Sequence, residues 1–277
     1  MSDSQLFVEE RHARIVEHLE ANRKASVGEL CEVFSVSGAT MRNDLRALEN
    51  AGLITRTHGG AMRRTRTGLE LDSLAKEVRN QDAKRTIARR ALQLVHDGDT
   101  IVLDTGTTTL ELARLLHDRR ELTVVTNDLA IALALEEVPD LTIVFLGGVV
   151  RKRFHCTVAH AEQSDPVLGT LSVDTAFMGT NSFSVEHGAS TPDLGTAHVK
   201  RRMMAIASSV VLLCDATKFE AESFARFATT REIDVLVADR LPDASAAREL
   251  REQNVDLICD DEPYAGTAAV TGTKEFS

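Results

Sequence analysis

The chain has 277 residues, of which 43% are hydrophobic, and its formal net charge is −10 at pH 7. This length predicts about two domains, and the longest stretch without a charged residue has 12 residues, too few for the roughly 20 that a membrane-spanning helix needs. No apolar run near the N-terminus resembles a secretory signal, and none of the four cysteines is in a C-x-x-C pair, so we expect a reduced cytoplasmic protein without a metal or other cofactor.

Two short helical patterns come first along the chain. Residues 8–22 place Ile15 and Leu19 at helical spacing. Ser26 and Glu29 form a capping-box pattern, in which a hydroxyl and a carboxylate bind free backbone N–H groups at the start of a second helix. The inner face of this second helix consists of Val27, Leu30 and Phe34. The pattern predicts a pair of packed helices joined by a short connection.

A third helix and a hairpin follow. Ser37 is a natural N-cap, and Gly52 is placed to end the helix in a left-handed conformation. The apolar face of this helix consists of Met41, Leu45 and Leu48. The strand-like residues that come next contain a Gly59-Gly60 turn. Three helices and a two-stranded hairpin within residues 6–64 predict a winged helix-turn-helix domain.

The third helix has a polar outer face suited to DNA. In a helix-turn-helix, the second of its two helices lies in the major groove and its N-terminal residues meet the bases. The outward residues are Gly38, Ala39, Thr40, Arg42, Asn43 and Arg46. Arginine suits guanine, asparagine suits adenine, and small methyl groups suit thymine, while Ser37 at the helix start suits a phosphate. This face predicts direct readout of double-stranded DNA.

Charge and the hairpin support the same function. Residues 37–67 contain six arginines against two acidic residues, a local charge of +4, although the whole chain is acidic. Arg56, His58 and Arg63 flank or form the turn of the hairpin, where they would contact DNA backbone or a minor groove. The alternative is an ordinary amphipathic helix with surface arginines, but that alternative leaves the caps, the tight turn and the arginine-flanked hairpin unexplained together.

The pattern changes after residue 64. Residues 65–82 are polar and are expected to form a linker with some helix, a helix is expected at 83–96, and residues 263–277 are expected to be disordered. Strand-like apolar runs lie at 100–104, 122–127, 141–147, 175–179, 210–215, 234–239 and 255–260. Because these runs are continuously apolar, both faces of the sheet should be buried. Residues 83–262 therefore predict a mostly parallel α/β domain.

Polar and glycine residues follow several of these runs. Ligands of parallel sheets bind outside the carboxyl ends of the strands. The candidate ligand residues at these ends are Asp104, Gly106, Thr107, Thr108, Thr126, Asn127, Gly147, Gly148, Arg151 and Lys218. A carboxylate, an amide, cations and a Thr/Gly cradle together suit a sugar bearing a phosphate. Each item alone is also explained by turn chemistry or by a solvated side chain.

The segment SVSGATMRNDLRALENAGLITRTHGGA resembles the signature of DeoR-type bacterial transcriptional regulators. The segments DTGTTT, TVVTNDLAIA, FLGGVVRKRF, VDTAFMGTN, AHVKRRM and CDATKF are similar to the effector domain of the same family. The resemblance implies a second domain similar in fold to ribose-5-phosphate isomerase that senses a phosphorylated sugar through the residues above. Lys200 is a weaker candidate, because its neighbours Arg201 and Arg202 favour a solvated helix face at least as much.

Two departures from the family pattern stand out. Asn43 occupies a position where the family usually has a second arginine, which affects either phosphate affinity or the base that is read. Residues 154–160 contain His155, Cys156 and His160 where the family more often has small residues, which would reshape the ligand pocket. The spacing of these three residues matches no zinc site.

Three functions compete on this evidence. The first is a repressor of a sugar or sugar-alcohol catabolism operon, acting as a homodimer or homotetramer and released by a sugar phosphate. The second is a sugar-phosphate isomerase or deaminase with Asp104, Asp174 and Lys218 as acid–base groups, although the run DTAFMG offers one carboxylate where such an enzyme would need more. The third is an activator or a sensor that does not bind DNA. We favour the first, which is not an enzyme.

Overall fold

The computed structural model describes residues 8–22, 24–50, 53–57, 59–63, 72–158, 168–219 and 221–259. The chain divides into two compact units, Met1–Leu69 and Glu70–Ser277, and each is described here by itself. Among the described residues no helix is long and apolar enough to cross a membrane. Gly52, His58, His160 and the tail 263–277, for which the sequence makes predictions, lie outside the described residues.

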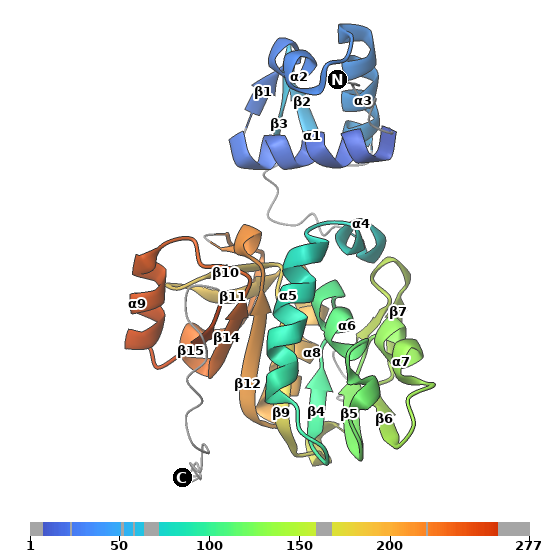
Figure 1. Cartoon of the computed structure of the whole chain (residues 1–277), viewed down its shortest axis with the longest axis vertical. Coiled ribbons are helices and arrows are strands. Elements are labelled where there is room, and N and C mark those ends of the chain that lie inside the picture. The colour runs from blue at the N-terminus through green and yellow to red at the C-terminus, as the bar shows by residue number, and fades with distance from the viewer. Residues whose placement is uncertain are drawn as a thin grey trace. The chain divides into compact units, whose positions relative to one another are not determined.

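The first unit is a three-helix domain with a small antiparallel sheet (Figure 1). Its elements are α1 (Val8–Asn22), β1 (Lys24–Ser26), α2 (Val27–Phe34), α3 (Gly38–Asn50), β2 (Ile54–Thr57) and β3 (Gly60–Arg63). The strand order is β1-β3-β2, so the predicted two-stranded hairpin is extended by a third strand. The prediction missed β1 because three residues are too few to show an alternating pattern. A Cβ at Gly60 would lie 2.3 Å from the carbonyl oxygen of Ala25, so this close pairing of β3 with β1 requires glycine.

The helices of the first unit form as the sequence predicts. Ser26 caps α2 in a complete capping box with Glu29. The turn between α2 and α3 begins at Ser35, which has a left-handed backbone with a φ of 51°. The core contains the predicted apolar residues Ile15, Leu19, Leu30, Met41, Leu45 and Leu48, with Val27 and Phe34 partly buried against it. One apolar core therefore fixes α3 against the other two helices.

A buried ion pair joins α1 to α3. Arg11 donates through Nε to Asp44 Oδ2 at 2.7 Å, and His12 Nε2 lies 3.0 Å from Asp44 Oδ1. Burial raises the pKa of Asp44, but the hydrogen bonds from Arg11 and His12 outweigh burial and hold that pKa below its ordinary value of 3.8. The carboxylate therefore stays charged at neutral pH and positions α3.

Asp44→Asn should destabilise the first unit by about 1–3 kcal/mol at neutral pH, because it removes a charged hydrogen-bond partner of the Arg11 guanidinium in the interior. A group with a lowered folded pKa stabilises above its unfolded pKa, and that stabilisation disappears as the pH falls through the folded pKa. The difference in unfolding free energy between the variant and the wild type should therefore become smaller as the pH falls below 3.8. Scanning calorimetry of the full chain at neutral and acidic pH measures this, and a difference independent of pH would contradict it.

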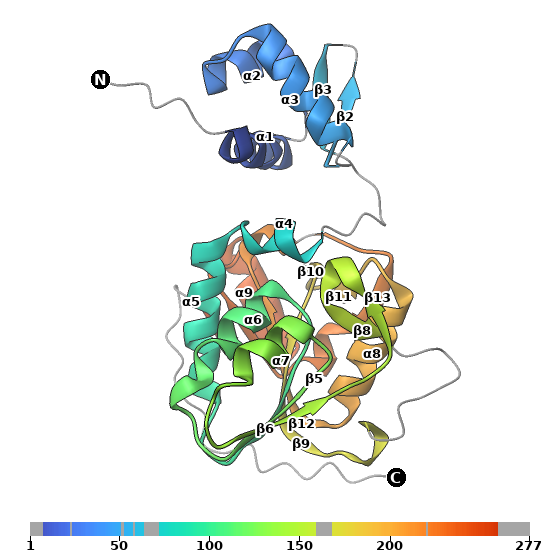
Figure 2. The ribbon, with the colours of Figure 1, turned by 90° about the vertical axis from the view of Figure 1, so that its right-hand side faces the viewer.

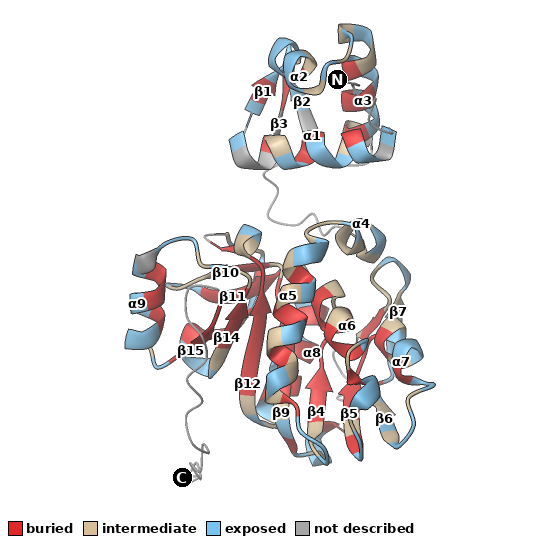
Figure 3. Cartoon of the chain, viewed as in Figure 1, coloured by how far each residue is buried: buried red, intermediate tan, exposed pale blue. Residues whose placement is uncertain are grey.

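The second unit is built on a seven-stranded sheet in which every pairing is parallel. In spatial order the strands are β15 (Asp256–Ile258), β14 (Val235–Ala238), β12 (Ala207–Cys214), β9 (Val173–Gly179), β4 (Thr100–Leu103), β5 (Leu122–Thr126) and β6 (Leu141–Phe145). All seven correspond to the predicted apolar runs. The burial of both faces in the central strands agrees with their continuous apolar sequence (Figure 3).

Helices cover both faces of this sheet (Figure 2). The helices of the second unit are α4 (Ser73–Glu77), α5 (Gln81–Ala91), α6 (Thr107–Ala113), α7 (Leu129–Leu135), α8 (Leu194–Ala205) and α9 (Ala244–Glu252). The helices α5, α6 and α7 share one apolar core with the sheet, and α8 and α9 share the other. Residues 73–77, within the predicted linker, form α4 and pack on the second unit.

Two small antiparallel sheets complete the second unit. One consists of β10 (Ser182–Ser184), β11 (Gly188–Thr191) and β13 (Ala225–Ala228), and the other of β7 (Val149–Arg151) and β8 (Cys156–Val158). Short 3-10 turns lie at Leu92–Leu94, Leu116–Asp118, Lys152–Phe154, Leu168–Thr170, Ala216–Lys218 and Thr230–Glu232. The connection from β9 to β10 and the β7–β8 hairpin both lie at the carboxyl edge of the large sheet, where the sequence predicts a ligand site (Figures 1 and 2).

Candidate functional site

The outer face of α3 presents the predicted DNA-reading residues. The hydroxyl of Ser37 accepts a hydrogen bond from the N–H of Thr40 at 3.1 Å, which confirms Ser37 as the cap of α3. Ala39, Arg42, Asn43 and Arg46 are exposed, and Gly38 and Thr40 are half-buried. Since Met41, Leu45 and Leu48 are buried, α3 has one face in the core and one polar face open to a ligand. This is the geometry that major-groove readout needs.

Asn43 is hydrogen-bonded to a second predicted DNA-reading residue, Arg46. Arg46 donates through Nη1 to Asn43 Oδ1 at 3.3 Å, one turn along α3. The amide oxygen of Asn43 is thereby engaged, and its NH₂ group remains as a donor. Asn43 and Arg46 therefore act as a pair, and an arginine in place of Asn43 would repel Arg46 instead of orienting it.

The hairpin of β2 and β3, which forms the wing of the predicted winged helix-turn-helix, is only partly described. Arg56 on β2 is exposed, and its backbone N–H donates to Glu49 Oε1 at 3.1 Å, while its guanidinium lies 3.6 Å from Glu49 Oε2. Glu49 therefore ties the wing to the C-terminal end of α3. Arg63 lies on β3, but its side chain and all of His58 are outside the described residues, so their contact with DNA stays a prediction.

The second unit has a pocket at the carboxyl edge of its large sheet. The lining residues are Ser73, Lys76, Thr105, Gly106, Thr107, Arg151, Phe154, Cys156, Asn181, Thr196 and Lys200. They come from α4, the loop after β4, the β7–β8 hairpin, the turn after β9, and α8. Three of the predicted ligand residues, Gly106, Thr107 and Arg151, meet here.

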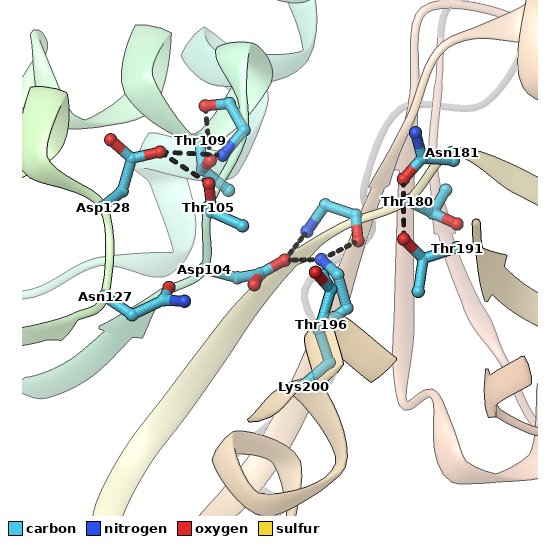
Figure 4. Close-up of polar contacts among 12 residues, drawn as sticks. Asp104, Thr105, Thr109, Asn127, Asp128, Thr180, Asn181, Thr191, Thr196 and Lys200 are labelled. Carbon is cyan, nitrogen blue, oxygen red and sulfur yellow. Dashed lines mark hydrogen bonds and ion pairs between the residues drawn. The ribbon is translucent and has the colours of Figure 1, made fainter. Parts of the chain in front are cut away.

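The loop between β4 and α6 is held rigidly by Asp128. Thr105 donates from its hydroxyl to Asp128 Oδ2 at 2.7 Å, and the N–H of Gly106 donates to the same oxygen at 3.3 Å (Figure 4). Gly106 has a φ of 153°, which favours glycine, and its carbonyl accepts from the hydroxyl of Thr109 at 2.8 Å. Burial raises the pKa of Asp128, and the hydrogen bonds from the Thr105 hydroxyl and the N–H of Gly106 oppose that rise. The loop is thus preorganised before any ligand arrives.

A buried ion pair lies at the base of the pocket (Figure 4). The ammonium of Lys200 contacts Asp104 Oδ2 and donates to the carbonyl oxygen of Gly179 at 3.0 Å, while the N–H of Gly179 donates to Asp104 Oδ2 at 3.0 Å. Lys200 is 3% exposed and Asp104 is fully buried. The interpretation of Lys200 as part of a solvated helix face is therefore wrong, because this lysine points into the domain while its neighbour Arg201 is exposed.

The environment of Asp104 is unusual. Burial raises the pKa of Asp104, and the Lys200 ammonium and the N–H of Gly179 oppose that rise. Its second oxygen, Oδ1, is buried and has no hydrogen-bond partner among the described residues. We interpret Asp104 as the residue that orients Lys200, because its own atoms are not at the pocket surface.

Cations surround the opening of the pocket. Arg151 donates through Nη1 to the hydroxyl of Thr196 at 2.8 Å, and its guanidinium lies 4.1 Å from the centre of the Phe154 ring. Lys76 lies over the same ring at 5.7 Å. Lys200 at the base of the pocket is paired with Asp104, and the Asp193 carboxylate lies 3.6 Å from Arg151, so three cationic side chains meet two carboxylates and leave one net positive charge. The pocket is therefore suited to an anionic ligand.

Several predicted ligand residues have other positions. Thr126 and Asn127 are buried, and the amide of Asn127 donates to the carbonyl oxygen of Thr157 at 2.7 Å, so these two support the β7–β8 hairpin. Thr108 is also buried. Lys218 lies 3.4 Å from Asp215. Gly147, Gly148 and Lys218, like Thr108, Thr126 and Asn127, are not among the residues that line the pocket.

The sequence prediction missed other pocket residues. Lys76 and Ser73 lie in the stretch interpreted as a linker, and Asn181 and Thr196 come from the turn after β9 and from α8. Phe154 and Cys156 belong to residues 154–160, which depart from the family pattern. That departure is the sequence signal that points to these two residues as part of the pocket. Burial raises the pKa of the Cys156 thiol to about 11, so this cysteine is an unreactive wall of the pocket. Within the described ranges, no group of His, Cys, Asp and Glu could hold a metal ion.

Comparison with known proteins agrees with both units. Residues 11–67 match the model of the DeoR-like helix-turn-helix domain, and residues 79–240 match that of the DeoR C terminal sensor domain. The chain is 37% identical to the HTH-type transcriptional regulator GlpR of Haloferax volcanii, with 90% of this chain and 96% of that protein covered. It is 32% identical to the HTH-type transcriptional repressor GlcR of Bacillus subtilis, over 91% of this chain and 96% of the relative. It is 34% identical to the transcriptional repressor AccR of Agrobacterium fabrum, over 83% and 89%.

Among solved structures, a D-ribose-5-phosphate isomerase in complex with phospho-erythronic acid aligns with a TM-score of 0.37 and 19% identity, over 50% of this chain and 54% of that chain. At this TM-score and identity the alignment supports no conclusion about the fold or the activity of this chain. The family models match both units, and the relatives match along nearly their whole length. The chain belongs to the DeoR family of DNA-binding transcriptional regulators.

Proposed function

We propose that this protein represses a sugar or sugar-alcohol catabolism operon and leaves its operator when a phosphorylated sugar binds to the second unit. The observation that supports this most directly is the convergence of Lys76, Arg151 and Lys200 on one pocket with polar groups between them. A phosphate needs cations and N–H donors, and the hydroxyls of a sugar need neutral polar partners. The pocket has both kinds of group.

The groups suited to a phosphate and the groups suited to sugar hydroxyls lie on different sides of the pocket. Lys76 and Arg151 lie beside Phe154 at the opening, and Thr107 at the start of α6 lines the same pocket. On another side of the pocket, Asn181 Oδ1 accepts from the hydroxyl of Thr191 at 3.1 Å, which leaves its NH₂ group to donate to a ligand (Figure 4). The phosphate is proposed to bind at the cationic side and the sugar hydroxyls near Asn181.

The helix α4 connects ligand binding to the DNA-binding unit along the chain. Ser73 and Lys76 of α4 line the pocket, and α4 is the first described element after β3. Lys84 contacts the carbonyl oxygen of Lys76 and donates to that of Arg79 at 2.5 Å, so it closes the end of α4. A ligand that binds Lys76 favours one position of α4 over others, and such a difference in affinity is what ligand control requires.

Catalysis is not favoured by the positions of the acid–base candidates. Asp174 is exposed and accepts from the N–H of Thr100 at 2.7 Å, at the amino end of β9. Asp104 is bonded to Gly179 at the carboxyl end of the same strand, about 16 Å away at 3.3 Å per residue. Lys218 is paired with Asp215 and is absent from the pocket lining. These groups do not converge on one substrate, so we propose a sensor that does not turn over its ligand.

A gel shift on the DNA upstream of the gene, titrated with a panel of sugar phosphates, tests the proposal. One or a few phosphorylated sugars should release the DNA, and the same sugars without phosphate should not. Binding of the upstream DNA that no member of the panel alters would contradict the proposed effector. Turnover of any member would contradict the proposed lack of catalysis.

Lys76→Met should leave operator affinity unchanged and weaken the effector response by about tenfold to a hundredfold, the effect of losing one charge-assisted contact. Lys218→Met is the matched comparison, because Lys218 is a lysine of the same unit that the structure places outside the pocket lining. Calorimetric titration with the active sugar phosphate measures both. A response that Lys218→Met abolishes and Lys76→Met leaves intact would place the ligand elsewhere.

A further inference from the structure

The edge of the large sheet at β6 is covered by an exposed apolar surface. We call it the β6 edge surface, and it consists of Leu129, Leu133, Phe145, Val149 and Val150. All five side chains are exposed, and Leu133 is 68% exposed. Figure 3 shows exposed and intermediate residues along α7, β6 and β7, in contrast to the buried strands at the centre of the sheet. Large apolar side chains that lie together at the surface of a domain mark an interaction site.

These residues are contiguous because the elements that bear them are bonded together. The helix α7 packs on β6, and the N–H of Leu129 at its start donates to the carbonyl oxygen of His155 at 2.7 Å. His155 directly precedes β8, which pairs with β7. The N–H of Leu146, just after β6, donates to the carbonyl oxygen of Thr126 on β5 at 2.8 Å. The surface therefore extends from α7 across the end of β6 to the hairpin.

The sequence of α7 indicates that its outer side is covered in the working protein. The helix reads LAIALAL, with Ile131 and Leu135 buried in the core and Leu129 and Leu133 outside. A helix that is apolar on every side is normally buried on every side. The strand β6, at one edge of the large sheet, also lacks the charged residues and prolines that usually protect a free sheet edge, since residues 141–150 contain neither.

The two ends of this surface have opposite charges. Glu136, Glu137 and Asp140 are exposed where α7 ends and the chain turns into β6. Lys152 and Arg153 are exposed at the other end, directly after β7. Among the described residues none of these five forms an ion pair with another side chain, so their charges are available to a partner.

We propose that the β6 edge surface binds a second copy of this chain, related by a two-fold axis that passes through the surface. A two-fold axis places the acidic end of one copy against the basic end of the other, which makes the surface complementary to itself. The apolar middle contains no charge, so two acidic chains meet there without repulsion. The proposal locates the oligomer contact of the proposed repressor and needs neither the operator nor the effector.

The oligomeric state of the full chain, measured without DNA or ligand, tests this contact. Sedimentation velocity should show a dimer or a larger even assembly for the wild type. Leu133→Asp should raise the dissociation constant on the order of a hundredfold or more, because the symmetric contact buries two uncompensated carboxylates. Phe224→Asp is the control, because Phe224 is also an exposed apolar residue and lies outside the β6 edge surface.

Charge reversal tests the two-fold arrangement itself. The variant Glu136→Lys/Glu137→Lys and the variant Lys152→Glu/Arg153→Glu should each weaken self-association, and the variant with all four changes should restore it. Circular dichroism verifies that every variant is folded. A monomeric wild type, a Leu133→Asp variant that associates as well as the Phe224→Asp control, or a fourfold variant weaker than either pair would overturn the proposal. A monomer that still binds sugar phosphate would overturn this contact and leave the proposed effector intact.

Discussion

Arg42→Ala is expected to abolish specific operator binding while the first unit stays folded. Arg42 is exposed on the outer face of α3, and the core contacts of this helix come from Met41, Leu45 and Leu48. A bidentate arginine–guanine contact discriminates by about 1–3 kcal/mol. In a two-fold assembly the contact is lost at both half-sites, so the free energy of specific binding should weaken by about 2–6 kcal/mol, a factor on the order of thirty to twenty thousand in affinity.

The matched control for Arg42→Ala is Arg14→Ala. Arg14 is an exposed arginine on α1 and pairs with Glu10, so its removal changes the net charge equally without touching the reading helix. Fluorescence anisotropy with an operator duplex and a scrambled duplex, each at several salt concentrations, separates base readout from phosphate contact. Arg42→Ala should lose affinity mainly for the operator. Equal losses of affinity for both duplexes would indicate that Arg42 contacts the DNA phosphates and not the bases. No loss of affinity would contradict the prediction that α3 reads the DNA.

The net charge of −10 is compatible with DNA binding because charge acts locally. Salt screens interactions beyond about 8–10 Å, so the charges that matter for DNA binding are those close to α3. Within the first unit the two acidic residues of α3 are already engaged, Asp44 by Arg11 in the interior and Glu49 by the backbone of Arg56. The outer face of α3 thus presents arginine and amide donors without a competing free carboxylate among its described side chains.

The elements that the sequence predicts well are those fixed by local patterns. The capping box of α2, the apolar face of α3 and the seven apolar runs of the large sheet each depend on residues close together in the chain. The strand β1 is too short to have a period, and it forms because β3 is present to pair with it. The helix α4 lies within the stretch where some helix is predicted and has an Asp72 cap, but its five residues are too few to predict its packing.

The pocket was predicted less well for a related reason. Lys200 lies beside Arg201 and Arg202, which is the local pattern of a solvated face, but its partner Asp104 is 96 residues away. Lys76 enters the pocket only because α4 packs against the second unit. Thr126 and Asn127 end a strand at the correct edge, but the β7–β8 hairpin covers them. Strand ends identify the edge of the sheet, whereas tertiary packing decides which side chains reach the pocket.

Lys200→Met is expected to destabilise the second unit by about 3–5 kcal/mol, because it leaves the Asp104 carboxylate buried without a counter-charge. That is a large part of the total stability of a domain, which is about 5–15 kcal/mol. The paired change Asp104→Asn/Lys200→Met should recover part of the loss, since a neutral amide can still accept from the N–H of Gly179 without a charge to compensate. Arg89→Met, at an exposed cation of α5 outside the β6 edge surface, is the control and should have little effect.

The pH dependence distinguishes an unpaired carboxylate from a simple loss of packing. Burial raises the pKa of Asp104, and removal of Lys200 removes one of the influences that oppose the rise. A carboxyl group with a raised folded pKa gives its full stabilisation below its unfolded pKa and loses it as the pH rises through the folded pKa. The stability of Lys200→Met should therefore be closest to that of the wild type in acid, and the difference in stability should grow as the pH rises toward neutrality. The chain has no tryptophan, so urea unfolding is best followed by circular dichroism. A Lys200→Met variant as stable as Arg89→Met at neutral pH, or a loss of stability that is constant with pH, would contradict the buried ion pair as the support of the pocket.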